Sequence, residues 1–398
     1  MAKQKTILTL EQALTLPYAT ERFAQLGWRV IRVEAPGMPG QNRPGDPNRY
    51  IGEDTGVDDL HAYFMAPNLG KEAITLNLKN KRDQKLLKKI IKELEVDVFM
   101  CNTLPKRYKQ FAIDYDTLKE VNPKLIWCGI SAFGPEYPDR AGYDPALQAM
   151  LGFMFLTGEP DRDPMLCGLP LIDLKAGDEA FAQVLLAMLE QKETGKGKRI
   201  DISMAQCATS WLITALPQVQ FAADETKLFT RSGNEHRSFI PSNCYPASDG
   251  YVYLAIGSDL QWQKFTEIEG FEHCIKQHRT TNNGRKEDKE NIYSDIRKGL
   301  ENYTTTEFIE VCLMNNLAVA PVNDVKKVGK LDFISEKMVK TILPNGKEVT
   351  LFTAPMDTDY LKENNNVMGM PPRLGEHNEK IFKECKIEDS QSNDKKGS

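Results

Sequence analysis

The sequence of 398 residues lacks the features that mark a membrane, secreted or nucleic-acid-binding protein. It contains no apolar run of about 18 residues, which a membrane-spanning helix needs. Its first residues show no apolar core followed by a small-residue cleavage site, so a secretory signal is not expected. The formal net charge of −5 and the lack of a dense basic run argue against nucleic acid as a partner. The sequence therefore predicts a cytoplasmic protein that binds neither a membrane nor nucleic acid.

Clustered metal ligands are missing as well. None of the eight cysteines lies within four residues of another, and the five histidines form no HExxH or similar pair. We expect the cysteines to be reduced and in several cases packed in the core. Neither a metal site nor a tightly bound cofactor is predicted.

Two common nucleotide-binding motifs are also absent. No GxGxxG follows the first predicted strand, which removes the main support for NAD binding. The glycine–lysine stretch at residues 194–198 lacks the upstream glycine of a phosphate-binding loop, and a strand-like run follows where a helix should begin. We interpret this stretch as a helix-to-strand turn.

The sequence does contain short β-rich runs that alternate with helical patterns. The predicted strands are Arg29–Val33, Ala73–Leu78, Val96–Met100, Lys124–Gly129 and Arg199–Ser203, and the predicted helices are Tyr18–Leu26, Lys81–Leu94 and Asp114–Val121. Strands and helices in this alternation favour right-handed crossovers, and therefore an α/β fold with a mainly parallel sheet. Functional residues in such sheets gather beyond the carboxyl ends of the strands, where Glu34, Asn102, Thr103 and Ser131 fall.

A second module follows a segment with little periodicity. Asp249-Gly250 predicts a hairpin turn, and helices are predicted at Gln261–Glu269, Tyr293–Glu301 and Thr306–Met314, with residues 279–290 as an exposed loop. We therefore divide the chain into residues 1–216 (first part of a large domain), 217–238 (a linker), 239–325 (a small α+β domain), 326–387 (a return linker and the C-terminal part of the large domain) and 388–398 (a flexible tail).

Asp173 lies where an apolar, turn-rich segment gives way to a helical pattern. Phe181, Val184, Leu185 and Met188 recur after it at helical spacing. The positive end of the helix dipole favours an ionised carboxylate at such a position. From these residues alone two roles stay open, an N-cap, for which Asp is a preferred residue, and a reactive carboxylate.

Short motifs occur in a fixed order along nearly the whole chain. They are Ala24-Gln25-Leu26-Gly27, Asn68-Leu69-Gly70-Lys71, Asn122-Pro123-Lys124, Ser131-Ala132-Phe133-Gly134-Pro135, Gly142-Tyr143-Asp144, Asp173-Leu174-Lys175-Ala176-Gly177, Thr194-Gly195-Lys196-Gly197, Ala320-Pro321-Val322-Asn323 and Pro372-Arg373-Leu374-Gly375-Glu376-His377. Together they resemble the family III CoA-transferases, which include formyl-CoA, carnitine and benzylsuccinate CoA-transferases. The resemblance implies a Rossmann-like large domain with a smaller α+β domain, in an interlocked dimer. It also implies an acyl-CoA and a carboxylic acid as substrates, and either a homodimer or a heterodimer with a paralogous subunit.

In the family that the sequence resembles, the aspartate at the position of Asp173 is the nucleophile. Its carboxylate attacks the acyl-CoA thioester to give a mixed anhydride, which CoA thiolate converts into an aspartyl-CoA thioester for the acceptor acid. Backbone N–H groups near the helix start are expected to stabilise the oxyanions. The resemblance places CoA along Arg43, Asn68, Leu69, Gly70, Lys71, Asn102, Thr103 and Lys106. Arg43 suits a phosphate through its forked donors, and the alternative for Arg43, Lys71 and Lys106 is an ordinary charged side chain without a ligand.

Alternative functions remain at this stage. Heteromeric members of the family contain a subunit that has lost the chemistry, so a non-catalytic partner subunit is one alternative. α-Methylacyl-CoA racemases share the fold but need a histidine in a Gly-His-Asp segment, where this chain has Gly142-Tyr143-Asp144 and tyrosine is a poor base at neutral pH. Succinyl-CoA is one candidate donor. Trp211, Phe221, Phe239 and Trp262 are candidates for an acyl pocket, with core packing as the favoured role of each.

Overall fold

The structure is a computed structural model that describes residues 3–37, 40–224 and 229–387. The predicted tail at residues 388–398 lies outside the described residues. Contacts divide the chain into two compact units, of which the first comprises the chain up to Leu151, Gly168–Gln220 and the chain from Glu336 on. The second comprises Gly152–Cys167 and Phe221–Ser335.

This division differs from the predicted domain boundaries at three places. It assigns residues 152–167 and 326–335 to the second unit, whereas the sequence analysis put them in the large domain and the return linker. It also divides the predicted linker, residues 217–238, between the two units after Gln220. Side-chain contacts explain the first difference, because Arg231 donates from Nε to the carbonyl oxygens of Glu159 and Arg162, both at 2.9 Å. The backbone N–H of Gly233 also donates to the carbonyl of Gly158 at 2.8 Å.

The first unit is built on a parallel sheet, which has six strands within the described residues. Its strands are β1 (Thr6–Leu10), β2 (Arg29–Glu34), β5 (Glu72–Thr75), β6 (Val98–Cys101), β7 (Ile126–Ser131) and β8 (Lys198–Ser203). All adjacent pairs are parallel, in the order β5-β2-β1-β6-β7-β8. The predicted parallel α/β sheet is confirmed, although the sequence analysis missed β1 because a short apolar run near the start of the chain has no periodicity of its own.

The order of the strands is that of a doubly wound sheet. Counted along the chain, the strands lie in the order 3-2-1-4-5-6, so the direction of winding reverses between β1 and β6. In open α/β sheets, ligands bind beyond the carboxyl ends of the strands at this reversal. The end of β1 and Asn102, which directly follows β6, are therefore where a site is expected.

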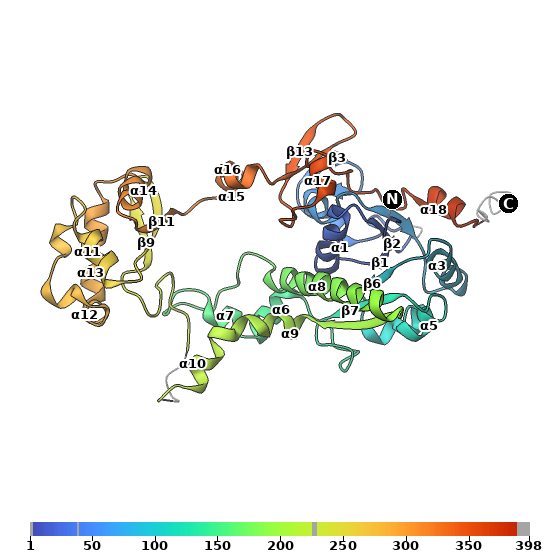
Figure 1. The fold of residues 1–398 in the computed structure, drawn as a ribbon, viewed down its shortest axis with the longest axis horizontal. Helices are drawn as coiled ribbons and strands as arrows, with labels where there is room; N and C mark the ends of the chain where they lie inside the picture. The colour runs from blue at the N-terminus through green and yellow to red at the C-terminus, as the bar shows by residue number, and fades with distance from the viewer. Residues whose placement is uncertain (1–2, 38–39, 225–228, 388–398) are drawn as a thin grey trace. The chain divides into compact units, whose positions relative to one another are not determined.

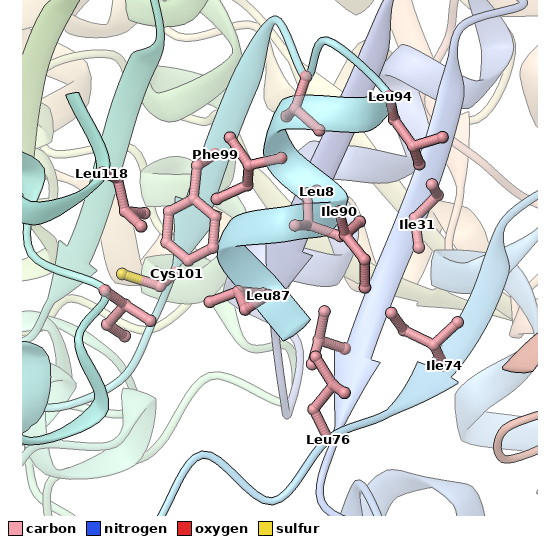
Figure 2. Close-up of a cluster of buried hydrophobic side chains, with 14 of the residues drawn as sticks. Leu8, Ile31, Ile74, Leu76, Leu87, Ile90, Leu94, Phe99, Cys101 and Leu118 are labelled. Carbon is pink, nitrogen blue, oxygen red and sulfur yellow. The ribbon is translucent and has the colours of Figure 1, made fainter. Parts of the chain in front are cut away.

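Helices cover both faces of the sheet (Figure 1). On one face, α3 (Lys81–Glu93), α5 (Tyr115–Lys119) and α18 (Asn378–Glu384) add apolar side chains to one buried cluster. Figure 2 shows Leu87 and Ile90 of α3 among strand residues such as Leu8, Ile31 and Ile74. On the other face, α1 (Thr15–Gln25) and the long α8 (Leu171–Thr194) pack on each other and on the strands. Phe23 and Phe181 join these two helices, with ring centroids 4.7 Å apart.

The first unit contains further elements, most of them short. They are η1 (Pro47–Tyr50), β3 (Asp54–Val57), β4 (Leu60–His61), α2 (Ala62–Met65), η2 (Ala66–Asn68), η3 (Pro105–Arg107), α4 (Tyr108–Phe111), α6 (Asp144–Met150), α9 (Met204–Ser210), η4 (Trp211–Thr214), α10 (Leu216–Gln220), β12 (Val339–Ile342), β13 (Glu348–Leu351) and α17 (Asp359–Glu363). The C-terminal segment returns to the sheet edge, where the backbone N–H of His377 donates to the carbonyl of Ala73 at 2.9 Å.

The second unit combines a small antiparallel sheet with helices. Its elements are α7 (Phe153–Leu156), β9 (Asn243–Ala247), β10 (Gly250–Ala255), α11 (Asp259–Thr266), η5 (Glu272–Cys274), η6 (Gln277–Thr280), α12 (Asn282–Glu287), α13 (Lys289–Leu300), α14 (Thr305–Met314), β11 (Ala318–Pro321), α15 (Val325–Val328) and α16 (Asp332–Ser335). The predicted hairpin at Asp249-Gly250 is confirmed. The predicted exposed loop at residues 279–290 is wrong, because it forms η6 and α12 and buries the guanidinium groups of Arg279 and Arg285 against acidic partners.

Six cysteines are buried, as expected of thiols packed in a core: Cys101, Cys128, Cys207, Cys274, Cys312 and Cys385. Across the described ranges, no helix has both the length and the apolar character needed to cross a membrane.

Candidate functional site

The loop between β1 and α1, residues 11–14, lies at the reversal of winding and is held from three sides. The carboxylate of Glu11 accepts a hydrogen bond from Nζ of Lys71 at 2.8 Å. The Asn102 side chain accepts from the backbone N–H of Gln12 at 3.1 Å and donates to its carbonyl at 2.7 Å. The backbone N–H of Ala13 donates to Oδ1 of Asp46 at 3.2 Å. Residues from three other segments therefore fix this loop.

Lys71 and Asn68 take part in a fully buried network behind the loop. Nζ of Lys71 donates to Glu11, to the Pro17 carbonyl at 2.9 Å, to Oγ1 of Thr20 at 2.7 Å and to Oδ1 of Asn68 at 3.2 Å. Burial lowers the pKa of Lys71 to about 8, although the adjacent Glu11 carboxylate raises it. With its donors occupied inside the protein, Lys71 has none left for a phosphate in this structure.

Buried charges continue the network to the next strand. Burial alone would raise the pKa of Glu34, but the guanidinium groups of Arg32 and Arg49 lower it to about 2. Nε of Arg49 donates to Glu34 at 2.9 Å, and Nη2 of Arg32 donates to Asp46 at 3.0 Å. Glu34 therefore serves as the counter-ion of two arginines and is not available to a ribose hydroxyl, in keeping with the absence of a dinucleotide motif.

Asp173 is the third residue of α8, and the N-cap position belongs to Pro170. Interpreting Asp173 as an N-cap is therefore wrong, since a cap residue lies outside the helix and accepts from the amides that follow it. In the first turn the carboxylate still lies at the positive end of the helix dipole. This position leaves the carboxylate of Asp173 available for chemistry.

The Asp173 carboxylate is held by α1 and is only partly accessible. Its Oδ1 accepts a hydrogen bond from the hydroxyl of Thr15, the first residue of α1. Burial raises the pKa of Asp173 to about 6, the Thr15 hydrogen bond lowers it, and the negative charge of Asp144 raises it further. At neutral pH the group is therefore mostly ionised but poorly solvated, which makes a carboxylate more reactive as a nucleophile.

Gly177 allows α1 to lie close enough for this contact. A Cβ at Gly177 would stand 2.8 Å from the carbonyl oxygen of Thr15 and 2.8 Å from Cδ1 of Tyr18. Any larger residue would push the two helices apart, because backbone atoms cannot yield as a flexible side chain does. The glycine one helical turn after Asp173 thus brings Thr15 within reach of the carboxylate.

The first backbone amides of α8 are already occupied. The N–H groups of Ile172 and Asp173 both donate to Oδ2 of Asp144, at 2.7 and 3.2 Å. The expectation that amides at this helix start stabilise oxyanions is therefore wrong for these two groups. Tyr63, on α2, is close enough to the carboxylates of Asp173 and Asp144 for both to raise the pKa of its phenol, after burial as the larger cause.

The other predicted CoA residues are distributed as follows. Arg43 is exposed, with its guanidinium carbon 5.8 Å from the ring centroid of Tyr50. Lys106 is exposed, and its Nζ lies 3.1 Å from Asp139. Thr103 is half-buried beside Asn102, at the carboxyl end of β6. Leu69 is fully buried, and the backbone N–H of Gly70 donates to the carbonyl of Gly369 at 2.8 Å.

Sequence reasoning missed Thr15, Tyr63 and the capping role of Asp144. Thr15 and Tyr63 are single residues without a motif, so no local signal identifies them. Asp144 was noted only as part of a motif, and its hydrogen bonds span 28 and 29 residues of sequence. Of the four aromatic candidates, Trp262 packs in the core of the second unit, whereas Trp211, Phe221 and Phe239 are exposed, so the favoured core role is wrong for these three.

Within the part of the chain that the structure describes, no cluster of three or more His, Cys, Asp or Glu side chains is arranged to hold a metal ion. The site thus consists of a partly buried carboxylate on α8, a hydroxyl from α1 and a rigid loop at the strand ends.

Comparison with known proteins gives the same family along the whole chain. The family model for CoA-transferase family III matches residues 3–378. A succinate–glutarate CoA-transferase of Agrobacterium fabrum is 26% identical over 397 residues, covering 95% of this chain and 94% of that protein. A succinyl-CoA:glutarate CoA-transferase of Mus musculus is 28% identical over 385 residues, covering 95% and 85%. An acetyl-CoA:oxalate CoA-transferase of Acetobacter aceti is 29% identical over 329 residues, covering 82% and 81%.

Solved structures agree with this assignment. A CAIB/BAIF family protein from Brucella suis superposes with a TM-score of 0.81 at 27% identity, covering 96% of this chain and 98% of that one. A protein from M. tuberculosis has the same fold, with a TM-score of 0.77 at 22% identity, covering 94% and 97%. The chain thus belongs to CoA-transferase family III and is an enzyme of that type.

Proposed function

We propose that this enzyme moves CoA from an acyl-CoA to a carboxylic acid through covalent intermediates on Asp173. The observation that carries the proposal is the Asp173 carboxylate itself. It is partly buried, has a pKa raised to about 6 by burial, and accepts one hydrogen bond from Thr15. A structural aspartate of this kind would be costly unless paired with a cation, and Asp173 faces a second carboxylate instead.

The proposed steps conserve the energy of the thioester. The Asp173 carboxylate attacks the thioester carbonyl and expels CoA thiolate, which leaves a mixed anhydride. The thiolate then attacks the aspartyl carbonyl, releasing the donor acid and forming an aspartyl-CoA thioester. The acceptor carboxylate attacks this thioester and expels CoA thiolate, which leaves a second anhydride between Asp173 and the acceptor. The thiolate then attacks the acceptor carbonyl of this anhydride, which gives the new acyl-CoA and restores the Asp173 carboxylate.

The proposed CoA path uses the exposed and half-buried residues of the predicted set. Asn102 and Thr103 follow β6 at the reversal of winding, and Arg43 and Lys106 present exposed cations suited to phosphates. Gly70 is exposed, so a ligand can approach its backbone. For Asn68, Leu69 and Lys71 the burial described above supports an indirect role, through the loop at residues 11–14.

For substrates, we propose succinyl-CoA as donor and a small dicarboxylic acid as acceptor. The support is the set of matched relatives, whose names include succinate, glutarate and oxalate. The direct test incubates the enzyme with succinyl-CoA and single acids, among them glutarate, oxalate and a monocarboxylate such as butyrate, and identifies the CoA products by mass spectrometry. Transfer to monocarboxylates alone would contradict the dicarboxylate assignment.

The alternatives are less well supported. A racemase needs a base opposite Asp173, and Tyr143 is 75% exposed and has a phenol unsuited to proton abstraction at neutral pH. A non-catalytic subunit would not need a desolvated carboxylate held by a hydroxyl. The same incubation, run in D₂O, would recognise both alternatives. A racemase would give deuterium uptake at Cα of the acyl group, and a non-catalytic subunit would give no transfer.

The acid limb of the pH profile should report the Asp173 carboxyl group. With a pKa of about 6, we expect the rate of donor-acid release from acyl-CoA to be level above about pH 7 and to fall about tenfold per unit below about pH 5.5. Single-turnover measurement without acceptor acid avoids titration of the acceptor, and circular dichroism at each pH excludes unfolding. A rate that is constant from about pH 5 to 8 would contradict a raised pKa.

We also propose that the enzyme forms a dimer with a second copy of itself or a paralogous subunit, because η4 and α10 expose large apolar side chains. Ile213 is 76% exposed and Val219 57% exposed, with Trp211 and Leu216 in the same stretch. Apolar surface of this kind is typical of an interface. We expect light scattering to give a dimer for the purified chain and a monomer for the double variant Ile213→Glu and Val219→Glu. The matched control is Ile342→Glu, at an exposed position on β12, and this variant should stay dimeric. A purified wild-type chain that is monomeric would contradict a homodimer.

A further inference from the structure

Helix α8 begins without a cap of its own. Its N-cap residue is Pro170, which has no side-chain oxygen, and no side chain at that position accepts a hydrogen bond. The first amides of any helix have no partner within the helix, and leaving them bare in a buried setting is costly. The helix that carries the proposed nucleophile therefore needs an acceptor from elsewhere in the fold.

Asp144, the first residue of α6, supplies that acceptor. Its Oδ2 accepts from the N–H groups of Ile172 and Asp173 at 2.7 and 3.2 Å, and its Oδ1 accepts from Nε2 of Gln148 at 2.6 Å. Gln148 also donates to the carbonyl of Leu169 at 3.2 Å, in the segment that leads into α8. Asp144 is 4% exposed and Gln148 is 1% exposed. Two side chains of α6, one helical turn apart, thus hold three backbone groups at the start of α8.

Building on the proposed role of Asp173 as nucleophile, we propose that Asp144 is a positioning residue that caps α8 from outside and fixes the backbone from which Asp173 extends. The cap acts at the amide of Asp173 itself, so a shift of this residue moves the reacting carboxylate directly. Displacement of a reacting group by about 1 Å can cost on the order of 100-fold in rate.

Asp144 also sets the charge around Asp173. The titratable groups that interact electrostatically with Asp173 are Asp144 from α6 and Tyr63 from α2, and the charged groups on the two packed helices include Arg22 on α1 and Lys175 on α8. Arg22 is paired with Asp178 and Lys175 with Glu179, the latter at 3.1 Å. A like charge disfavours ionisation, so Asp144 raises the pKa of Asp173 in the same direction as burial. The capping residue therefore makes the carboxylate more basic as well as holding it in place.

Two substitutions separate these effects. Asp144→Asn keeps one oxygen for the amides of α8 but removes the charge and presents an N–H₂ group to Gln148. We expect the acid limb of donor-acid release to move down by about half a unit to one unit, with kcat reduced about tenfold. Asp144→Ala removes the acceptor as well, and should reduce kcat about 100-fold with KM for acyl-CoA changed less than about threefold, because Asp144 makes no substrate contact in this assignment.

The matched control is Asp114→Ala, which removes another capping aspartate. Asp114 accepts from the N–H of Thr117 at the start of α5, on the other face of the sheet. This variant should lower the melting temperature but leave kcat and the acid limb unchanged. The proposal is overturned if Asp144→Asn, with melting temperature and circular dichroism showing it to be folded, keeps the wild-type acid limb and kcat. A rise in KM at constant kcat would overturn it too, since Asp144 would then contact substrate.

Failure of this inference can be told from failure of the proposed function. If Asp173→Ala retains transfer, the covalent mechanism is wrong whatever Asp144 does. If Asp173 is required and both Asp144 variants behave as wild type, only the positioning role is wrong.

Discussion

Replacing Asp173 with alanine is expected to reduce CoA transfer by at least about 10³-fold, because in the proposed mechanism no other group can form the aspartyl anhydride. Asp173→Asn should be equally inactive, since an amide is a poor nucleophile. The covalent intermediate gives an independent measurement. Incubation of the wild-type enzyme with acyl-CoA and hydroxylamine should convert Asp173 into its hydroxamate, detectable in the peptide that contains it, and neither variant should give this product.

The Asp173→Asn substitution should also stabilise the fold. The pKa of the Asp173 carboxyl group is raised from 3.8 to about 6 on folding, so the native state disfavours the ionised form. The associated destabilisation is absent at low pH, appears as pH rises through this interval and is complete above about pH 6. Asp173→Asn removes it while keeping an oxygen for Thr15, and should raise the free energy of unfolding at about pH 7.5 by on the order of 1–3 kcal/mol.

An Asp173→Asn variant that is inactive but no more stable than wild type would contradict the burial of the carboxylate. Retention of transfer by Asp173→Ala would contradict the mechanism itself.

Replacing Glu34 with glutamine is expected to give a large loss of stability. Glu34 is 3% exposed and is the shared counter-ion of Arg32 and Arg49, which are both fully buried. Without its charge, two buried guanidinium groups lose a partner, which typically costs about 3–5 kcal/mol. Linkage gives a similar figure, since lowering the pKa from 4.5 to about 2 corresponds to about 3 kcal/mol at neutral pH. Denaturant titration at neutral pH measures this difference.

The pH dependence identifies the cause of that loss. Because folding lowers the pKa of Glu34, its contribution is fully present above about pH 4.5 and is lost as pH falls toward about 2. The Glu34→Gln variant should therefore differ from wild type by less at about pH 3 than at pH 7. Glu190→Gln is the matched control, because Glu190 pairs with Lys198 at the surface and its removal should change stability by less than about 1 kcal/mol. Equal effects of the two substitutions would contradict the buried network.

Much of the sheet and its helices could be predicted because local pattern is sufficient for them. The predicted helix Lys81–Leu94 is observed at Lys81–Glu93, and the predicted strands at Arg29, Ala73, Val96, Lys124 and Arg199 all correspond to strands of the sheet. An amphipathic helix or a short β-rich run is recognisable from neighbouring residues, since its apolar face repeats within a few positions. By contrast, β1 is buried on both faces at the centre of the sheet, and such a strand shows no alternation.

The sequence by itself determined the α/β alternation, the family resemblance and the choice of Asp173 as the candidate nucleophile. Only the tertiary structure decided which charged residues face solvent and which face one another. The sequence suggested Lys71 as a phosphate ligand. In the structure its ammonium group is buried and donates a hydrogen bond to Glu11, which is 60 residues away in the chain. Thr15 and Asp144 reach Asp173 across 158 and 29 residues. A hydrogen bond depends on distance in space, and a single sequence records distance only along the chain. The partners of Asp173, which hold its position and raise or lower its pKa, therefore become visible only when α1, α6 and α8 are packed together.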